Sequence, residues 1–327
     1  MEFGLALVLV LVLGAEFVNG WTDAPNAIAT VVGTRAMPPV AAVVMAAVLN
    51  LAGVLIGTKV ATTIGKGIVD PAAIDLTTVG AAMTGIIIWS SLAARYGIPT
   101  SESHALVAGL AGAGLGTAGP AVLVWSGWSK VFIGLFFSTV LGFLAAYLVM
   151  VAIYWIFRGK TISNTRTLFR VLQIGSSGFM ALSHGSNDGQ KFMGVFTLAL
   201  VLAGQLPTFD IPLWVIVLCA AVMALGTLTG GWRIIRTMGM RLSRLETHQG
   251  FAAEIAAAST IQVATAAGIP LSTTHTITSA IVGVGATRGV TAVRWYVARQ
   301  LILAWILTFP ICAAIAWIVV RIFRAIA

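Results

Sequence analysis

Long apolar stretches separated by short polar turns run through almost all of this chain. Examples are residues 40–57, 76–94, 121–157 and 213–231, and about 20 apolar residues suffice for a helix to cross a bilayer. Charged residues make up only 9% of the chain, against about 25% in soluble domains. None of these stretches alternates with the period of two that β-barrel strands show. The sequence therefore predicts an all-α, polytopic transmembrane helical bundle without a soluble domain.

The net charge of +9 comes from basic residues in short loops between the apolar stretches. One group lies within residues 158–170 and another within residues 233–244. Basic loops of this kind are held on the cytoplasmic side of a membrane. No basic patch interleaved with aromatic residues indicates nucleic-acid binding. We therefore expect a multi-pass protein of the cell membrane, with the lipid bilayer as a partner and no nucleic acid. Whether it forms a homo-oligomer is left open.

Two small polar islands, each with a carboxylate, interrupt the apolar pattern at residues 19–26 and 184–191. A charged side chain at mid-membrane depth costs about 2.5–3.5 kcal/mol or more, and it usually faces a pathway or cavity. Pro25 in the first island, and Gly185 and Gly189 in the second, are expected to break helix hydrogen bonding there. Interrupted helices at matching places in two halves of a chain indicate a transport site.

A second pattern shows that the chain is an internal duplication. The pattern Gly-Ile-Pro-x-Ser-x-x-His-x7-Gly-x-Gly occurs at residues 97–114 and again at 268–285, 171 residues later. We therefore expect a first transmembrane repeat at 1–157, a basic cytoplasmic linker at 158–170 and a second transmembrane repeat at 171–327. An inverted arrangement of the two homologous repeats is expected. Residues 121–157 could form one or two spans, so the parallel arrangement stays open.

Each copy of this pattern places hydroxyls beside a proline within an apolar region, which predicts a short re-entrant hairpin. Irregular backbone at membrane depth occurs only where it is buried in protein or lines a watery cavity. The helix N-termini of two such hairpins, with their hydroxyls, would form a site for a tetrahedral oxyanion. The alternative is that the hydroxyls bond to their own helix backbone. The expected anion ligands are Ser101, Ser103, Ser272, Thr273 and Thr274.

The acids Asp23 and Asp188 would repel an anion unless they hold cations or protons. Carboxylate and amide oxygens suit hard cations, and Asn26 and Asn187 stand beside the two acids. Lys191, three residues after Asp188, would either neutralise it or touch the substrate. Anion entry would then require cation entry, which is symport. The coupling ion is Na+ or H+, and no other metal or cofactor is expected. Glu102, within the first hairpin, is either a further coupling acid or a structural cap.

The islands and hairpins together resemble the inorganic phosphate transporter (PiT) family, whose members are anion permeases built of two homologous halves. Residues 23–30 resemble its first signature and residues 185–194 its second, and the resemblance covers nearly the whole chain. It implies a cation and phosphate centre formed by Asp23, Asn26, Asn187 and Asp188, with the hairpin hydroxyls around phosphate. Three departures are Thr22, where the family usually has asparagine, Ala29, where the second half has Gly194, and Glu102, where the second half has Thr273.

These patterns predict a secondary active transporter, a symporter that carries inorganic phosphate inward with Na+ or H+. A sulfate permease of the same fold is the first alternative. An anion channel is the second, but a channel gains nothing from two buried acids. A Ser/His hydrolase needs a single catalytic centre, and the duplicated Ser and His positions argue against one, so no catalytic residue is expected. The number of spans, the affinity, and transport of a metal–phosphate complex stay open.

Overall fold

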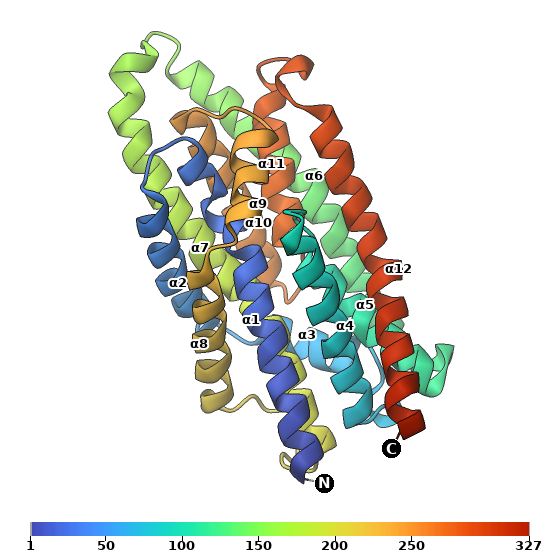
Figure 1. The fold of residues 1–327 in the computed structure, drawn as a ribbon. Helices are drawn as coiled ribbons and strands as arrows, with labels where there is room; N and C mark the ends of the chain where they lie inside the picture. The colour runs from blue at the N-terminus through green and yellow to red at the C-terminus, as the bar shows by residue number, and fades with distance from the viewer. Residues whose placement is uncertain (1, 327) are drawn as a thin grey trace.

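The computed structural model describes residues 2–326, and these fold into a bundle of α-helices (Figure 1). Within that range, short 3-10 turns at Pro71–Ala73, Pro120–Val122 and Val290–Ala292 and a π-helical turn, η3, at Thr237–Arg241 connect the helices. The α-helices are α1 Glu2–Gly33, α2 Pro39–Val54, α3 Lys59–Gly67, α4 Leu76–Arg95, α5 Glu102–Ala118, α6 Trp125–Ile156, α7 Ile162–Leu202, α8 Leu213–Thr229, α9 Trp232–Arg236, α10 Thr247–Ala266, α11 Thr273–Ala286 and α12 Trp295–Ile326.

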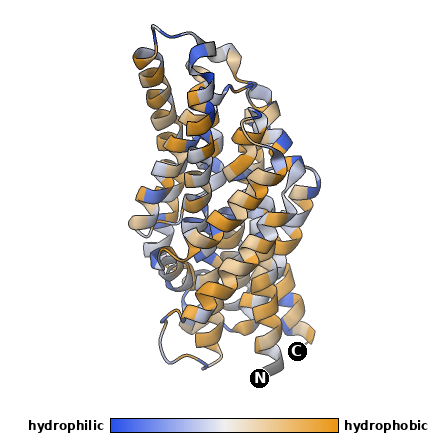
Figure 2. Cartoon of the chain, turned by 90° about the vertical axis from the view of Figure 1, so that its left-hand side faces the viewer, coloured by the Kyte–Doolittle hydropathy of each residue, from blue (hydrophilic) through white to orange (hydrophobic). Residues whose placement is uncertain are grey.

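Four of the described helices, α1, α4, α6 and α12, are long and apolar enough to cross a membrane. Two more spans are available if the bent pairs α2–α3 and α8–α9 with η3 each count as one. Their bends are 73° and 60°. Hydrophilic residues lie at the end opposite the two termini and also on helices in the middle of the bundle (Figure 2). The prediction of an all-α, polytopic bundle with broken helices is confirmed.

The breaks do not lie where the sequence predicted them. Both polar islands lie inside continuous helices, because α1 runs through Pro25 and the 41-residue α7 runs through Gly185 and Gly189. Helix glycines allow close packing of a neighbouring backbone. A Cβ at Gly185 would lie 2.2 Å from the carbonyl oxygen of Asn50 in α2, and one at Gly20 equally close to that of Met223 in α8. The islands therefore bring neighbouring helices together instead of ending their own.

Of the one or two spans that residues 121–157 could form, the structure has one, the long helix α6, which starts at Trp125 after a short 3-10 turn. Two further boundaries differ from the expected ones. Between the apolar stretches 40–57 and 76–94, where only a polar turn was expected, the chain forms α3. The basic linker at 158–170 is mostly helical, because α7 starts at Ile162 and only a short turn separates it from α6. Basic residues at this turn therefore lie on a helix end, not on a flexible connection.

Two helical hairpins enter the bundle from opposite ends (Figure 1). The first is α4–α5 and the second α10–α11, and each turns through a glycine with positive φ, Gly97 at +68° and Gly268 at +67°. Glycine adopts this conformation without the steric cost that other residues incur. The tips lie against each other, since the rings of His104 and His275 are 4.4 Å apart. The predicted re-entrant hairpins thus meet inside the bundle.

Each hairpin tip is held by the short helix of the opposite half. From α3, Lys59 Nζ donates to the carbonyl of Ala266 at 3.0 Å. In the same way, Arg233 of α9 donates to the carbonyl of Arg95. A threonine one turn further along then bonds the hairpin glycine: Thr63 to Gly268 at 2.8 Å and Thr237 to Gly97 at 3.0 Å. We call these two sets of contacts the tip clamps.

Candidate functional site

Four segments converge at the centre of the bundle: the islands of α1 and α7 and the N-termini of α5 and α11. From α1, Asn26 Nδ2 donates to Thr273 Oγ1 at 3.2 Å and to Thr274 Oγ1 at 2.9 Å. From α5, Ser103 Oγ donates to the carbonyl of Leu271 at 2.9 Å. These side chains are almost fully buried. The structure therefore brings together residues that are as much as 251 positions apart in the sequence.

The second half contributes a buried ion pair between Lys191 and Asp188. Lys191 Nζ also donates to Ser103 Oγ at 2.6 Å and to the carbonyl of Leu271 at 2.9 Å. The other carboxylate oxygen of Asp188 accepts from Thr273 Oγ1 at 2.8 Å. Both charged side chains are at most 1% exposed. The charges of Lys191 and Asp188 therefore cancel, and the lysine points toward the hairpin tips.

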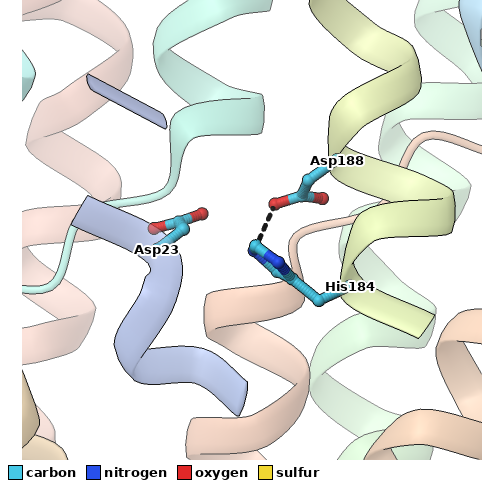
Figure 3. A group of neighbouring side chains, drawn as sticks. All are labelled: Asp23, His184 and Asp188. Carbon is cyan, nitrogen blue, oxygen red and sulfur yellow. Dashed lines mark ion pairs between the residues drawn. The ribbon is translucent and has the colours of Figure 1, made fainter. Parts of the chain in front are cut away.

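The first half contributes Asp23, for which no described residue supplies an ion-pair partner. Its Oδ1 accepts from Thr274 Oγ1 at 3.3 Å. Asp23, His184 and Asp188 face one another (Figure 3), and one potential ligand atom of each lies within 4.8 Å of the other two. His184 Nε2 lies 3.3 Å from Asp188 Oδ2. Buried charges are normally paired or bound to a metal ion, so this group is suited to hold a cation.

Both asparagines of the expected centre leave an amide oxygen free. Asn187 Nδ2 donates to Thr265 Oγ1 at 2.9 Å and to the carbonyl of Ile269 at 3.3 Å. The Oδ1 atoms of Asn26 and Asn187 are buried and have no hydrogen-bond partner among the described residues. Buried polar atoms seldom stay unpaired. These two oxygens are therefore available to a cation or to water.

Ser101 and Ser272 have a different role from the other hydroxyls. Each is the N-cap of its helix and accepts from the backbone N–H of the histidine three residues on, His104 at 3.3 Å and His275 at 3.2 Å. The alternative of bonding to the helix backbone therefore holds for these two serines. Capping orients the N-termini of α5 and α11, whose partial positive charge favours an anion. His275 stacks on Trp305 at 3.7 Å, so the histidines pack the tips.

Glu102 does not face the two aspartates with a free oxygen. Thr22 Oγ1 donates to its Oε1 at 2.9 Å and Ser90 Oγ to its Oε2 at 2.8 Å. Two of the departures from the family pattern, Thr22 and Glu102, are therefore in direct contact with each other. Of the two roles expected for Glu102, this geometry favours the structural one.

Sequence reasoning missed Asn50 and Ser90, which lie behind the site. Asn50 Oδ1 lies 3.0 Å from His184 Nδ1, and its amide donates to Thr227 Oγ1 at 3.1 Å. This contact fixes the ring that faces Asp188. A single asparagine in the apolar run of α2, itself fully buried, is the signal that could have revealed it.

Buried acids, a lysine, hydroxyls and helix N-termini converge between hairpins inside a bundle of membrane-length helices. This combination defines a membrane transporter for a charged solute and not an enzyme. A sequence model described as "Phosphate transporter family" matches residues 19–316. The chain therefore belongs to the phosphate transporter family, whose substrate is phosphate, and it is a membrane protein.

Curated relatives agree with this assignment. A protein of Rhizobium meliloti (strain 1021) described as "Probable low-affinity inorganic phosphate transporter" is 44% identical over 319 residues, which cover 97% of this chain and 96% of the relative. A protein of Bacillus subtilis (strain 168) with the same description is 38% identical, over 94% of each chain. A solved structure, "The sodium-dependent phosphate transporter", matches 99% of this chain with a TM-score of 0.90 at 24% identity, and this likeness concerns the fold.

Proposed function

We propose that this chain is a symporter of the plasma membrane that carries inorganic phosphate inward together with Na+. The observation that carries the proposal is the charge of the site. Lys191 neutralises Asp188, but Asp23 has no ion-pair partner among the described residues. An anion that entered this buried site alone would add to an unbalanced negative charge, which is costly at low dielectric. A cation bound at Asp23 removes that cost, so anion and cation binding are coupled.

The oxygen ligands around Asp23 support Na+ as the coupling ion. The Asp188 carboxylate and the Thr274 hydroxyl lie beside it, and hard cations prefer oxygen ligands of this kind. Asp23 and Asp188 would bind the cation with Asn26 and Asn187, while Ser103, Thr273, Thr274 and Lys191 would contact the anion. The relative with the same fold is described as sodium-dependent. H+ is the alternative coupling ion, and the experiment below separates the two.

The same acids favour phosphate over sulfate. Near neutral pH phosphate keeps at least one proton and can donate it to a carboxylate oxygen, whereas sulfate has none to donate. A site that is built to accept a hydrogen bond rejects an analogue that cannot donate one, because its polar group stays unpaired. Asp23 and Asp188 supply such acceptors next to the hairpin hydroxyls.

Matching contacts in the two halves support inverted repeats at 1–157 and 171–327. Helix α1 packs on α8 and α7 on α2, while α12 packs on α5 and α6 on α11. Substrate sites of such transporters lie between repeats that rock against each other. Release of one tip clamp while the other holds would open the site to one side at a time. The basic turn between α6 and α7 would face the cytoplasm.

Uptake of radiolabelled phosphate into proteoliposomes tests the proposal, with Na+ and proton gradients imposed separately. We expect an inward Na+ gradient to concentrate phosphate, and excess unlabelled arsenate to compete more strongly than sulfate. Concentration by a proton gradient alone would replace Na+ by H+. If neither gradient concentrates phosphate, the symport proposal is wrong.

A further inference from the structure

A cavity of about 420 Å³ beside the first hairpin tip is lined by Arg233, Arg236 and Arg241. All three side chains are exposed, and no acidic residue of the described chain forms an ion pair with any of them. Arg294 adds a positive charge nearby, since its Nη1 donates to the carbonyl of Arg241 at 3.3 Å. The cavity therefore concentrates positive charge that no described acid balances, and it favours an anion.

The local backbone brings these arginines to one side of their segment. Arg233 and Arg236 are three residues apart on α9, so they share a face of the helix. Arg236 and Arg241 are five residues apart, and such positions diverge by about 140° on an α-helix. The π-helical turn η3 instead pairs each residue with the fifth one after it, which places such positions one turn above each other. The π turn therefore gathers the guanidinium groups around one cavity, and turns of this kind are frequent at functional sites.

An apolar groove of about 420 Å³ adjoins this cavity and shares with it the lining residues Tyr96, Gly97, Thr237 and Arg241. The groove runs between α4 and α12, which pack against each other (Figure 1). Its further walls are mostly apolar and include Trp89 of α4 and Leu303 and Leu307 of α12. The two leucines are exposed on a helix that is long enough to cross a membrane, so they face lipid. The groove therefore leads from the arginines into the bilayer.

A positively charged cavity that continues into an apolar groove matches the two parts of an anionic phospholipid. Arginine binds phosphate oxygens through two parallel hydrogen bonds, and the groove accommodates an acyl chain. The contact with Arg294 places the cavity toward the start of α12, at the end of the bundle where the basic turn joins α6 and α7 (Figure 1). Anionic lipids are enriched in the leaflet that basic loops face, and basic pockets between spans bind their headgroups. A free phosphate ion would leave the groove unused.

We propose that Arg236 and Arg241, with Arg233, bind the phosphate of an anionic phospholipid whose acyl chain lies between α4 and α12. The site includes the first tip clamp, because Arg233 and Thr237 line the cavity and donate to the carbonyls of Arg95 and Gly97. Without an anion the arginines repel one another, which opposes the packing of α9 and η3 on the hairpin tip. A bound headgroup removes that repulsion and so holds the clamp closed.

The test is a titration of the full chain, in an uncharged detergent at constant ionic strength, with dioleoyl phosphatidylglycerol, and bound lipid is counted by native mass spectrometry. Dioleoyl phosphatidylcholine, which has no net charge, should bind much more weakly. The double variant Arg236→Gln with Arg241→Gln should lose about tenfold or more in affinity, since each basic residue near an anionic lipid contributes about fivefold. Arg35→Gln with Arg166→Gln removes the same charge from exposed positions outside both cavities. This matched control should keep the wild-type affinity.

Two further arms separate the lipid from a small anion. Ala304→Trp, which fills the groove and keeps the arginines, should also weaken binding of phosphatidylglycerol. Glycerol phosphate, which carries the charge without acyl chains, should not displace the lipid at equal concentration. Displacement by glycerol phosphate, or wild-type affinity in Ala304→Trp, would make the cavity a site for small anions and overturn the lipid proposal. Wild-type affinity in the double arginine variant would overturn it as well.

Hydrogen–deuterium exchange measures the effect on the clamp without any transport assay. Backbone amides of residues 93–100, at the first hairpin tip, should exchange severalfold more slowly when phosphatidylglycerol binds to wild type. The double arginine variant should show no such change, and the matched control should behave as wild type. Unchanged exchange in lipid-bound wild type would refute the coupling between the headgroup and the clamp.

Discussion

The two copies of the site use the same positions for different chemistry. Asn26 in the first half and Lys191 in the second are 165 residues apart and make equivalent contacts. Asn26 bonds Thr274 at 2.9 Å, and Lys191 bonds Ser103 at 2.6 Å, the corresponding hydroxyl of the other hairpin. The two copies therefore share the backbone arrangement, and only the second carries a charge at this position.

This difference assigns separate tasks to the two copies. In the second half, a lysine balances the acid, and Thr273 supplies a hydroxyl. In the first half, neutral Asn26 leaves Asp23 unbalanced, and Glu102 stands at the position of Thr273. Under the proposed function, the second copy would contact the anion and the first copy would bind the cation.

Removing Asp188, the acid that is paired with Lys191 in the second half, should have the largest effect on transport. In Asp188→Asn, Lys191 would be left buried without its partner, and the loss of one partner of a buried ion pair costs about 3–5 kcal/mol. We expect phosphate uptake to fall by about a hundredfold or more, with a lower thermal midpoint. Asp210→Asn serves as the exposed control. Uptake at the wild-type rate with unchanged ion dependence would remove Asp188 from the site.

Making the second copy resemble the first is the next largest change. Lys191→Asn removes the positive charge that we expect to contact the anion, and truncation of a buried hydrogen-bonded charge costs about 2–5 kcal/mol. The KM for phosphate is expected to rise at least about tenfold, with a steeper dependence on Na+, because a second cation must now balance Asp188. Initial rates over a matrix of phosphate and Na+ concentrations measure both effects. An unchanged KM would show that Lys191 does not contact the substrate.

Making the first half resemble the second at two other positions should cost much less. The double change Thr22→Asn and Glu102→Thr replaces two residues that bond each other, and a hydrogen bond contributes about 0.5–1.5 kcal/mol net. We expect uptake within about tenfold of wild type and no change in the number of Na+ ions per phosphate. A changed stoichiometry, measured from reversal potentials, would make Glu102 a coupling acid after all.

The two tip clamps can be compared by removing one threonine hydroxyl from each. Thr63→Val and Thr237→Val each remove one bond to a hairpin glycine, at about 0.5–1.5 kcal/mol. If the clamps close opposite sides, the two variants should favour opposite orientations of the transporter. Labelling of a single cysteine from either side of the membrane would report this. The same labelling pattern in both variants would refute separate gates.

The smallest effect is expected at an exposed helix end. Burial alone would raise the pKa of Asp75, but hydrogen bonds from Thr78 and the charge of Arg324 outweigh it and hold the pKa below its usual range. This contribution to stability is complete above the usual pKa of about 3.9 and is lost as the pH falls through the folded value. Asp75→Asn should lower the stability by about 1 kcal/mol or less at neutral pH, and the loss should disappear in acid. Thermal melts at several pH values test this.

The sequence predicted the residues of the site better than it predicted the backbone that carries them. The islands and the hairpin patterns stand out because polar residues are rare in apolar stretches, and the duplication marks them twice. Hence Asp23, Asn26, Ser103, Thr273 and Lys191 were all expected, and the structure brings them together. Whether they bind the substrate and the coupling ion remains a prediction that the variants above test.

What the sequence could not reveal depends on partners that are distant in the chain. Pro25 and the glycines of α7 read as helix breaks, but a neighbouring helix packs against each island and the helices continue. Glu102 read as either a coupling acid or a cap, and only the position of Ser90 and Thr22 distinguishes the two. The role of Asn50 could not be predicted from its neighbours in the sequence, because Asn50 acts through a contact with His184, 134 residues later.

The tip clamps also have a consequence for how the protein is made. Each hairpin is held by a basic side chain and a threonine of the other half. When the first half enters the membrane during synthesis, the carbonyls of Arg95 and Gly97 have no partner until Arg233 and Thr237 are translated. The second hairpin, by contrast, finds Lys59 and Thr63 already in place. Biogenesis is therefore ordered: the amino-terminal half must wait with a polar tip unpaired, and the carboxy-terminal half completes it.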